Sequence, residues 1–392
     1  MAVYGGRMTT FALVGFGFRA AAFHRVAQCL PGVDCVAAVV RDPHKRPLPV
    51  PAFPDLAACV RATRPDFVVT AVPKAANPDV IAEAVALEVP VLAETPPAPD
   101  LSGLRELWAS AGASGLVQVA EQYLLMPTHA ARLATVRSGL IGAPTQVQVS
   151  STQQYHAMSL IRGLLGVGFA PAAVRAVRTV APLLDPLDRG GWTGDPEPKL
   201  ATTTIATLHF GGAADGARAA EGGSEVAGNE RGGRERGGSE PGLGGGQSAV
   251  YDFTTNQTRN LLRFRRLLVR GTHGELQDDE IVHLAAPRAI GRSALVRRQS
   301  GHDLDLNGFD TETIMLDGQV LFRNPYVGSR FNDDEIATAT LLNAMAAWVR
   351  GAGPPPYPLA DGVQDQLLAL AVEEAADTGR EVVTGVEAWS PA

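Results

Sequence analysis

Phe11 to Ala20, "FALVGFGFRA", reads as a buried strand that turns directly into a helix. The apolar run ends at Gly15, and the residues from Arg19 onward ("RAAAFHRVAQCL") have helical spacing and good helix formers. The small residues between the two follow the pattern G-x-G-x-x-A, with Gly17 at its second glycine. Because the pattern lies at a strand-to-helix turn, it predicts a loop that binds the pyrophosphate of a dinucleotide.

Each small residue of this loop has a separate task. Gly15 allows a tight turn, Gly17 lets a pyrophosphate approach the backbone, and Ala20 lets the helix pack closely on the strand. The helix N-terminus attracts the negative charge of the phosphates. The alternative is that the glycines serve only the geometry of a turn. We take the whole loop as cofactor-binding: Gly15, Phe16, Gly17, Phe18, Arg19 and Ala20.

Strands and helices alternate over the first part of the chain. Continuous apolar runs predict strands at 11–16, 35–40, 66–73, 90–94 and 115–123, and helical spacing predicts helices at 19–30, 56–63, 78–87 and from Asp100 onward. Continuous rather than alternating strands are typical of a parallel sheet covered on both faces. The sequence therefore predicts a Rossmann domain, a doubly wound parallel sheet, over residues 11–127, after a flexible extension at 1–10.

The pattern changes in the second part of the chain. "PTQVQVSSTQ" (144–153) alternates polar and apolar residues, as a half-buried antiparallel strand does. The arginine-rich "RNLLRFRRLLVR" (259–270) could form an anion site, but we interpret its alternation as the solvated face of a strand, as in "FRRLLVR" (264–270). Two late helices follow. We expect a C-terminal substrate and oligomerisation domain over residues 128–392, with a mostly antiparallel open sheet and helices on one face. Residues 211–246, rich in Gly, Glu, Ser and Arg, are predicted to be a disordered insertion at a hairpin tip.

Composition excludes several classes of protein. The net charge of −7 argues against nucleic acid or an anionic membrane as the partner. The three cysteines have no ligand spacing, so no metal site is predicted. No apolar run approaches the roughly 20 residues that a membrane helix needs. We expect a cytoplasmic protein that binds a small molecule and forms a homo-oligomer, a dimer or tetramer.

The end of the second expected strand bears on the choice of cofactor. An acidic residue there binds the free ribose hydroxyls of NAD, whereas an arginine suits the 2′-phosphate of NADP. Arg41 falls at this tip and Asp42 follows it, with Lys45 and Arg46 close behind. The pattern favours NADP over NAD. The alternative is that Arg41 is only solvated and that Asp42 bonds the ribose.

Four motifs together resemble the Gfo/Idh/MocA oxidoreductases: "GFGFRA" (15–20), "AVP" (71–73), "ETP" (94–96) and "YHAMSLIRGLLG" (155–166). The resemblance covers almost the whole chain, including the closing "PYPLADGVQDQLLALAVEEAADTGREV". It implies a Rossmann domain, then an α/β domain whose open sheet often forms an oligomer interface. It also implies NAD(P)-dependent redox chemistry on a sugar, polyol or related carbonyl compound. On this resemblance Val72, Pro73, Glu94 and Thr95 contact the cofactor.

The chain departs from the family at the residues that carry the chemistry. The lysine of the family's Glu-Lys-Pro falls on Thr95, and the aspartate of its Asp-x-x-x-His falls on Thr152. A further acidic residue often found there falls on Ser159, and only the histidine, His156, is kept. His156 is therefore the candidate acid and base, since imidazole titrates near neutral pH. Lys74 could supply an ammonium group, or could be a solvated loop residue.

Hydrogen-bonding partners complete the expected site. Tyr123 and Tyr155 could orient a substrate or relay a proton, and Thr95 could donate a hydrogen bond. Glu121 and Gln122, just before Tyr123, are expected at the same crevice. His129, on the following helix, is interpreted as a residue of its outer face.

The sequence supports three functions. The first is an NAD(P)-dependent oxidoreductase that moves hydride to or from a small polar carbonyl or alcohol, such as a sugar or polyol derivative. The second is a catalytically silent NAD(P)-binding regulator or partner subunit, motivated by the missing lysine and aspartate. The third is an NAD-dependent lyase or glycosidase that oxidises its substrate transiently.

Overall fold

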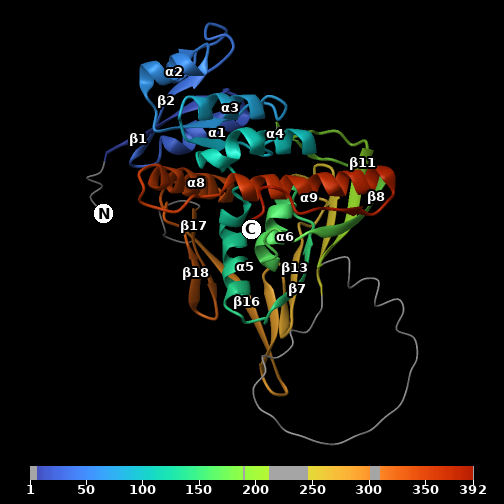
Figure 1. The fold of residues 1–392 in the computed structure, drawn as a ribbon. Helices are drawn as coiled ribbons and strands as arrows, with labels where there is room; N and C mark the ends of the chain where they lie inside the picture. The colour runs from blue at the N-terminus through green and yellow to red at the C-terminus, as the bar shows by residue number, and fades with distance from the viewer. Residues whose placement is uncertain (1–6, 189, 212–245, 301–309, 392) are drawn as a thin grey trace, which may run out of the picture.

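The computed structural model describes residues 7–188, 190–211, 246–300 and 310–391, and these build two large sheets and a two-stranded one, β10-β9 (Figure 1). The first sheet has the strand order β3-β2-β1-β4-β5-β6 and is parallel throughout. The second has the order β18-β17-β16-β15-β14-β13-β7-β12-β11-β8-β19. The predicted fold class, a Rossmann sheet followed by a mostly antiparallel sheet with helices, is confirmed.

The first sheet and its helices run in the order β1 (Thr9–Val14), α1 (Phe18–Ala27), β2 (Val33–Val39), β3 (Ala52–Phe53), α2 (Leu56–Thr63), β4 (Phe67–Thr70), α3 (Asn77–Ala86), β5 (Val91–Ala93), α4 (Leu101–Ala111) and β6 (Val117–Val119). The second sheet and the remaining elements are α5 (Pro127–Arg137), β7 (Pro144–Val149), α6 (Gln154–Leu165), β8 (Ala172–Leu183), β9 (Leu187–Asp188), β10 (Gly191–Trp192), β11 (Lys199–Phe210), β12 (Gln247–Thr254), β13 (Leu267–Gly271), β14 (Gly274–Gln277), β15 (Glu280–Ala286), β16 (Ala289–Ser300), β17 (Asp310–Leu316), β18 (Gln319–Arg323), α8 (Asp333–Val349), α9 (Leu359–Thr378) and β19 (Val382–Val383).

Local signals set most of the helix ends. Asp55 and Asp100 accept backbone N–H groups at the starts of α2 and α4, which satisfies donors that a helix start leaves unpaired. Gly379 ends α9 in the left-handed conformation, as expected. β1 begins at Thr9, two residues before the expected start of the Rossmann domain. Most of the segment 211–246 lies outside the described residues.

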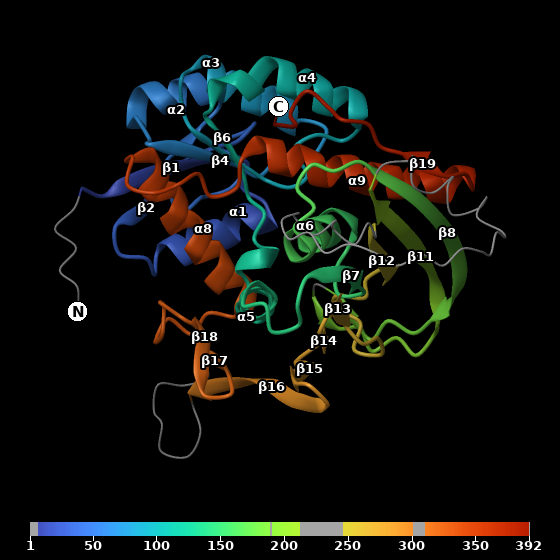
Figure 2. The same cartoon turned by 60° about the horizontal axis from the view of Figure 1, so that its bottom comes forward.

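Helices from the end of the chain return to the Rossmann sheet. One face of that sheet packs α1 against α8 through an apolar cluster that includes Phe23, Leu342 and Met345. The opposite face packs α4 and α9 through Leu104 and Val363. Figures 1 and 2 show α8 and α9 lying across the middle of the molecule, between the first sheet and the second. The helix α9 belongs to the cores of both halves, since Leu368 and Val372 pack in the cluster of the second sheet, whereas the buried apolar residues of α8 belong to the cluster that it shares with α1.

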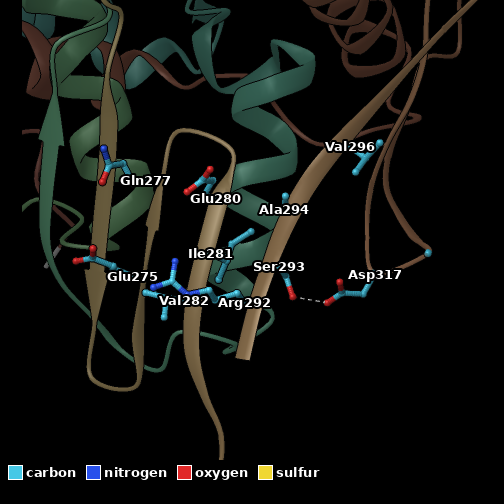
Figure 3. Close-up of a pocket in the computed structure, with 11 residues that line it drawn as sticks. Glu275, Gln277, Glu280, Ile281, Val282, Arg292, Ser293, Ala294, Val296 and Asp317 are labelled. Atoms are coloured by element: carbon cyan, nitrogen blue, oxygen red, sulfur yellow. Dashed lines mark hydrogen bonds between the residues drawn. The ribbon is translucent and has the colours of Figure 1, made fainter. Parts of the chain in front are cut away.

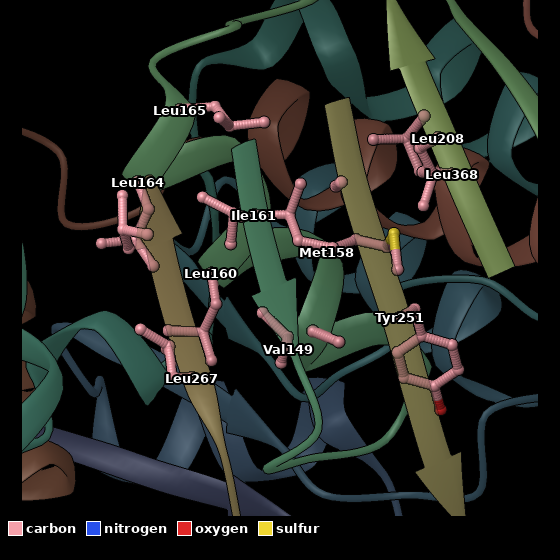
Figure 4. Packing of buried hydrophobic residues seen from close by; sticks show 14 of the residues in the cluster. Val149, Met158, Leu160, Ile161, Leu164, Leu165, Leu208, Tyr251, Leu267 and Leu368 are labelled. Atoms are coloured by element: carbon pink, nitrogen blue, oxygen red, sulfur yellow. The ribbon is translucent and has the colours of Figure 1, made fainter. Parts of the chain in front are cut away.

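The apolar side of α6 anchors it to the second sheet. Met158, Ile161 and Leu165 pack against residues of the sheet, among them Val149 of β7 and Tyr251 of β12 (Figure 4). The strand β7 pairs antiparallel with β13 but parallel with β12, so the antiparallel interpretation of 144–153 is correct on one side only. α6 follows β7 after a short turn, which fixes the first turn of α6 near the Rossmann sheet.

The strand expected at 264–270 begins three residues late. Residues 259–266 form turns and loop, and β13 starts at Leu267. The side chain of Gln257 donates to the carbonyls of Ser150 and Phe264, and that of Asn260 donates to the carbonyl of Leu184. These side-chain bonds offer the backbone an alternative to a strand ladder.

Among the helices of the described ranges, none has the length and hydropathy needed to cross a bilayer.

Candidate functional site

The glycine-rich loop between β1 and α1 fits an anionic group. Gly15 has a φ of +92°, and a Cβ there would stand 2.5 Å from the carbonyl oxygen of Ala71, so only glycine fits. A Cβ on Gly17 would meet nothing within 4 Å, which leaves the backbone open on that side. Gly17 is also the N-cap of α1, which has no side-chain cap and no acidic residue in its first turn. The helix start is therefore electrostatically suited to a phosphate.

The loop after β2 brings a cation onto the glycine-rich loop. Arg46 lies over the ring of Phe16, with its Cζ 5.9 Å from the ring centroid, and donates to the carbonyl of Phe16. The carboxylate of Asp42 accepts the backbone N–H of His44 at 3.0 Å, so part of its bonding capacity closes its own turn. Arg41 is exposed. Arg46, which the sequence places close behind Arg41, is thus a positive group at this edge.

Arg19 joins the Rossmann loop to the second domain. Its Nε lies 2.7 Å from Glu94 Oε1, and its Nη1 lies 2.8 Å from Oδ2 of Asp334 at the start of α8. Gln122 donates to the other oxygen of Asp334 at 3.1 Å. Burial alone would lower the pKa of Arg19, but the two carboxylates outweigh it and raise that pKa. Arg19 and Glu94 thus bond to each other across the crevice floor.

The ends of β4 and β5 face the same loop. Val72 lies beside the position that a Gly15 side chain would take, whereas Pro73 and Lys74 are exposed. The backbone N–H of Thr95 donates to Glu94 Oε2 at 3.0 Å, and the Thr95–Pro96 peptide bond is cis. The hydroxyl of the half-buried Thr95 has no hydrogen-bond partner among the described residues. It is free to bond a ligand.

His156, in the first turn of α6, is bonded to a buried carboxylate. Its Nδ1 lies 2.6 Å from Glu121 Oε2, and the Glu121 side chain is 0% exposed. The imidazole stacks on the ring of Tyr123, with centroids 4.3 Å apart and planes 24° apart. Its side chain is 12% exposed, and within the described chain its Nε2 has no hydrogen-bond partner. One ring nitrogen is thus held while the other is open.

The expected strand at 115–123 ends early, and this places the carboxylate. β6 stops at Val119, and Glu121 accepts the backbone N–H of Tyr123 at 2.9 Å, which forms a turn at the carboxyl end of the sheet. Tyr123 then begins a short 3₁₀ helix. Burial raises the pKa of the Tyr123 phenol.

His129 is not on the outer face of its helix, which corrects the sequence interpretation. It is 9% exposed, and its ring lies against that of Tyr123 with centroids 6.2 Å apart. Burial, with the charges of Arg132 and Arg265, lowers the pKa of His129 to about 3. His129 is therefore neutral, and its ring packs against that of Tyr123.

Tyr155 points into the core rather than into the crevice. It is 6% exposed, packs with Val363 and other residues of the Rossmann-side cluster, and meets the ring of His156 edge-on at 5.5 Å. Its hydroxyl has no partner within the described chain.

A buried ion pair also lies near Tyr155. Arg162 Nη1 lies 2.6 Å from Asp365 Oδ1. Burial raises the pKa of Asp365 to about 7, although Arg162 pulls it down.

The structure therefore brings most of the expected residues to one edge of the first sheet. Glu121 as the partner of His156 and Asp334 on Arg19 are functional neighbours that sequence reasoning did not assign. Glu121 carried a signal, its place after the last strand, and Asp334 carried none. In the described ranges, no group of His, Cys, Asp and Glu is arranged to hold a metal ion.

A separate hollow of about 710 Å³ lies on the second sheet, away from these residues (Figure 3). Strands β14 to β16 and the turn at Asp317 line it, and Ser293 donates to Asp317 at 2.7 Å. It contains none of the candidate site residues. The hollow is thus a feature of the open sheet and not of the crevice.

Comparisons with known proteins agree with this arrangement. The model of the Gfo/Idh/MocA oxidoreductase family, NAD-binding Rossmann fold, matches residues 9–122. No curated protein sequence matches the chain. An oxidoreductase from Agrobacterium radiobacter, solved with NAD⁺, L-tartaric acid and magnesium, is 16% identical with a TM-score of 0.59, covering 95% of this chain and 98% of that one.

Two further solved structures share the fold over nearly their whole length. A myo-inositol dehydrogenase from Corynebacterium glutamicum is 17% identical with a TM-score of 0.59, covering 96% of this chain and 99% of that one. An oxidoreductase from Desulfitobacterium hafniense, described as NADPH-dependent, is 11% identical with a TM-score of 0.62, covering 96% and 98%. At these identities the structures show a common fold. The family model thus matches the first domain of this chain, and the solved structures share its fold over nearly the whole chain.

Proposed function

We propose that the chain is an NAD(P)-dependent oxidoreductase that moves hydride to or from a small polar carbonyl or alcohol, such as a sugar or polyol derivative. The observation that carries the proposal is the pairing of His156 with Glu121 beside an uncapped glycine-rich helix start. The dehydrogenases with the same fold, one of them named for myo-inositol, support the substrate class.

The chain's own residues divide the work. The bound nicotinamide would accept a hydride from the carbon of a CH–OH group, or return it. His156 Nε2 takes the proton of the hydroxyl as the C–H bond breaks, leaving the carbonyl, and returns it in the reverse direction. Thr95 and Tyr123 donate hydrogen bonds that hold the substrate oxygen. Tyr155, which lies in the core, supports the imidazole by packing.

The cofactor is held at the carboxyl edge of the first sheet. Gly17 and the start of α1 bind the pyrophosphate, and Val72 with Pro73 lines the nicotinamide side. We favour NADP over NAD because Arg41 and Arg46 can both reach a 2′-phosphate, while Asp42 is partly used in its own turn. Glu94 and Arg19, bonded to each other, close the floor of the crevice.

We further propose that two or more copies assemble through the open face of the second sheet. Exposed apolar side chains lie along its strands, among them Val177 and its cross-strand neighbour Ile205, which are 57% and 42% exposed, and Val296, which is 56% exposed. A second copy of the same sheet would bury them. Light scattering after size exclusion should give a dimer or tetramer, and a monomer at micromolar concentration would oppose this assembly.

A second candidate function is a catalytically silent NAD(P)-binding subunit. It is favoured by the absence of a lysine at Thr95 and of a carboxylate at Thr152. A lyase or glycosidase that oxidises its substrate transiently is a third, with product formed but no net reduction of the cofactor.

Turnover separates these functions. Purified protein is incubated with NADP⁺ or NAD⁺ and a panel of polyols and aldoses, and with NADPH or NADH and keto sugars, while nicotinamide absorbance near 340 nm is followed. The proposal predicts a change with at least one substrate that is lost in His156→Ala. Tight cofactor binding without turnover would support the silent subunit, and product without net absorbance change would support transient oxidation.

A further inference from the structure

We propose that Glu121 is the positioning residue of His156: its carboxylate holds Nδ1–H and so leaves Nε2 as the proton acceptor at the crevice. The inference rests on the proposed function, because it names the group that orients the proposed acid and base. The resemblance leads one to expect the acidic residues near His156 at Thr152, in the turn before α6, and at Ser159, on α6. The inference places the carboxylate at the end of β6 instead.

Glu121 is a buried carboxylate, and each of its polar contacts is with a hydrogen-bond donor. Oε2 lies 2.6 Å from Nδ1 of His156. Oε1 accepts the backbone N–H of Tyr123 at 2.9 Å and lies 3.0 Å from the hydroxyl of Ser159, whose one proton is shared with the carbonyl of His156 at 2.9 Å. A carboxylate that is 0% exposed needs such compensation, since an unpaired buried charge is costly. The three donors hold the carboxylate in one orientation.

This geometry selects one tautomer of the imidazole. An ionised carboxylate can only accept hydrogen bonds, so Nδ1 of His156 must carry the proton. In the neutral ring Nε2 then has a lone pair, and it is the nitrogen without a partner. Stacking on Tyr123 at 4.3 Å and edge contact with Tyr155 at 5.5 Å keep the ring from rotating. The base is thereby preorganised.

The two positions where the family resemblance leads one to expect acidic residues hold hydroxyls instead. The hydroxyl of Ser159 lies 3.0 Å from Glu121 Oε1, and the buried hydroxyl of Thr152 has no hydrogen-bond partner among the described residues. The carboxylate absent from both is supplied at position 121, which lies 35 residues from His156 and on the Rossmann side. As a consequence, the two domains must pack against each other before the imidazole of His156 is correctly oriented.

The direct test is the tautomer of His156, measured in the folded protein without substrate. Nitrogen-15 labelled imidazoles are observed by NMR at about pH 8, where an ordinary imidazole is neutral, and the His156 signals are assigned by their loss in His156→Gln. The expected result is protonated Nδ1 in the wild type and a shift toward protonated Nε2 in Glu121→Gln. Protonated Nε2 in the wild type, or an unchanged tautomer in folded Glu121→Gln, would overturn the inference.

Kinetics provide a second readout. In Glu121→Gln we expect kcat to fall about 10²- to 10⁴-fold with KM within a fewfold of wild type, because the base is misoriented while the substrate contacts remain. Glu121→Asp should recover part of kcat. Asp310→Asn is the matched control: Asp310 is 1% exposed and bonds Asn324 and a backbone turn, so this variant should keep kcat even if stability falls. Equal losses of kcat in the two neutralised variants would contradict a positioning role.

Failure of the inference and of the proposed function are distinguishable. If no substrate is turned over but the tautomers behave as expected, the oxidoreductase proposal fails and the role of Glu121 in orienting His156 stands. If turnover depends on His156 but the tautomer ignores Glu121, the function stands and the positioning role is wrong.

Discussion

The two glycines of the first loop should respond differently to the same added methyl group. Gly15→Ala places a Cβ 2.5 Å from the backbone oxygen of Ala71 at a φ of +92°. The positive φ costs about 1–2 kcal/mol and the clash about 1–3 kcal/mol. Ala71 is bonded to Val14 across the sheet and cannot move away cheaply. We expect the free energy of unfolding to fall by about 2–5 kcal/mol, measured by urea denaturation.

Gly17→Ala is the matched variant. Gly17 has a φ of −91° and a ψ of −164°, which any residue adopts, and its Cβ would meet nothing within 4 Å. The free energy of unfolding should therefore change by less than about 1 kcal/mol. The methyl occupies the space where a pyrophosphate must approach the backbone. Loss of one charge-assisted hydrogen bond, about 1.5–3 kcal/mol, would weaken dinucleotide binding about 10- to 150-fold.

The assay is fluorescence titration with NADPH and NADH, alongside urea denaturation of the same preparations. The expected result is a stable Gly17→Ala protein with weak binding and a destabilised Gly15→Ala protein. A Gly17→Ala protein that binds both dinucleotides with wild-type Kd would refute the placement of the pyrophosphate on this loop. A Gly15→Ala protein as stable as the wild type would refute the clash.

Three other substitutions test separate parts of the structure. Arg46→Ala should raise the Kd of NADPH about tenfold and leave that of NADH unchanged, by calorimetry; equal effects on both would remove Arg46 from the 2′-phosphate. Arg162→Met should cost about 3–5 kcal/mol, because Asp365 stays buried without its cation, and the double change with Asp365→Leu should recover much of it. The pKa of Asp365 is already raised to about 7, so its contribution to stability is full below about pH 4 and is lost as the pH rises through 7. Arg162→Met raises this pKa further. The loss of unfolding free energy in Arg162→Met, measured by urea denaturation, should therefore be smaller at pH 5 than at pH 8. Thr95→Val should lower kcat if the hydroxyl holds the substrate oxygen, whereas higher activity in Thr95→Lys on common polyols would mark the threonine as the loss of a catalytic lysine.

Local sequence signals predicted the parts of the fold that depend on neighbours in the chain. The alternation of apolar runs and helical spacing and the helix start at Asp100 act over a few residues, and the structure confirms both. The strand expected at 264–270 begins only at Leu267, because side chains of Gln257 and Asn260 bond the preceding loop to carbonyls that lie partly on distant segments. Periodicity does not report such contacts.

The candidate site was predictable residue by residue but not as a network. His156, Thr95 and Tyr123 could be placed from the order of strands and the resemblance. Their partners could not, because those contacts join different domains: Glu121 lies 35 residues from His156, and Asp334 lies 315 residues from Arg19. The sequence spacing around His156 does not reveal a carboxylate that lies on a different element, since only the folded chain brings the two elements together.

The central claim is that the carboxyl edge of the first sheet binds a nicotinamide dinucleotide. Isothermal calorimetry of the purified chain with NADPH, and then with NADH, tests it most directly. The account predicts one saturable site per chain, with NADPH bound more tightly than NADH. No heat of binding with either dinucleotide, confirmed by unchanged nicotinamide fluorescence, would contradict it.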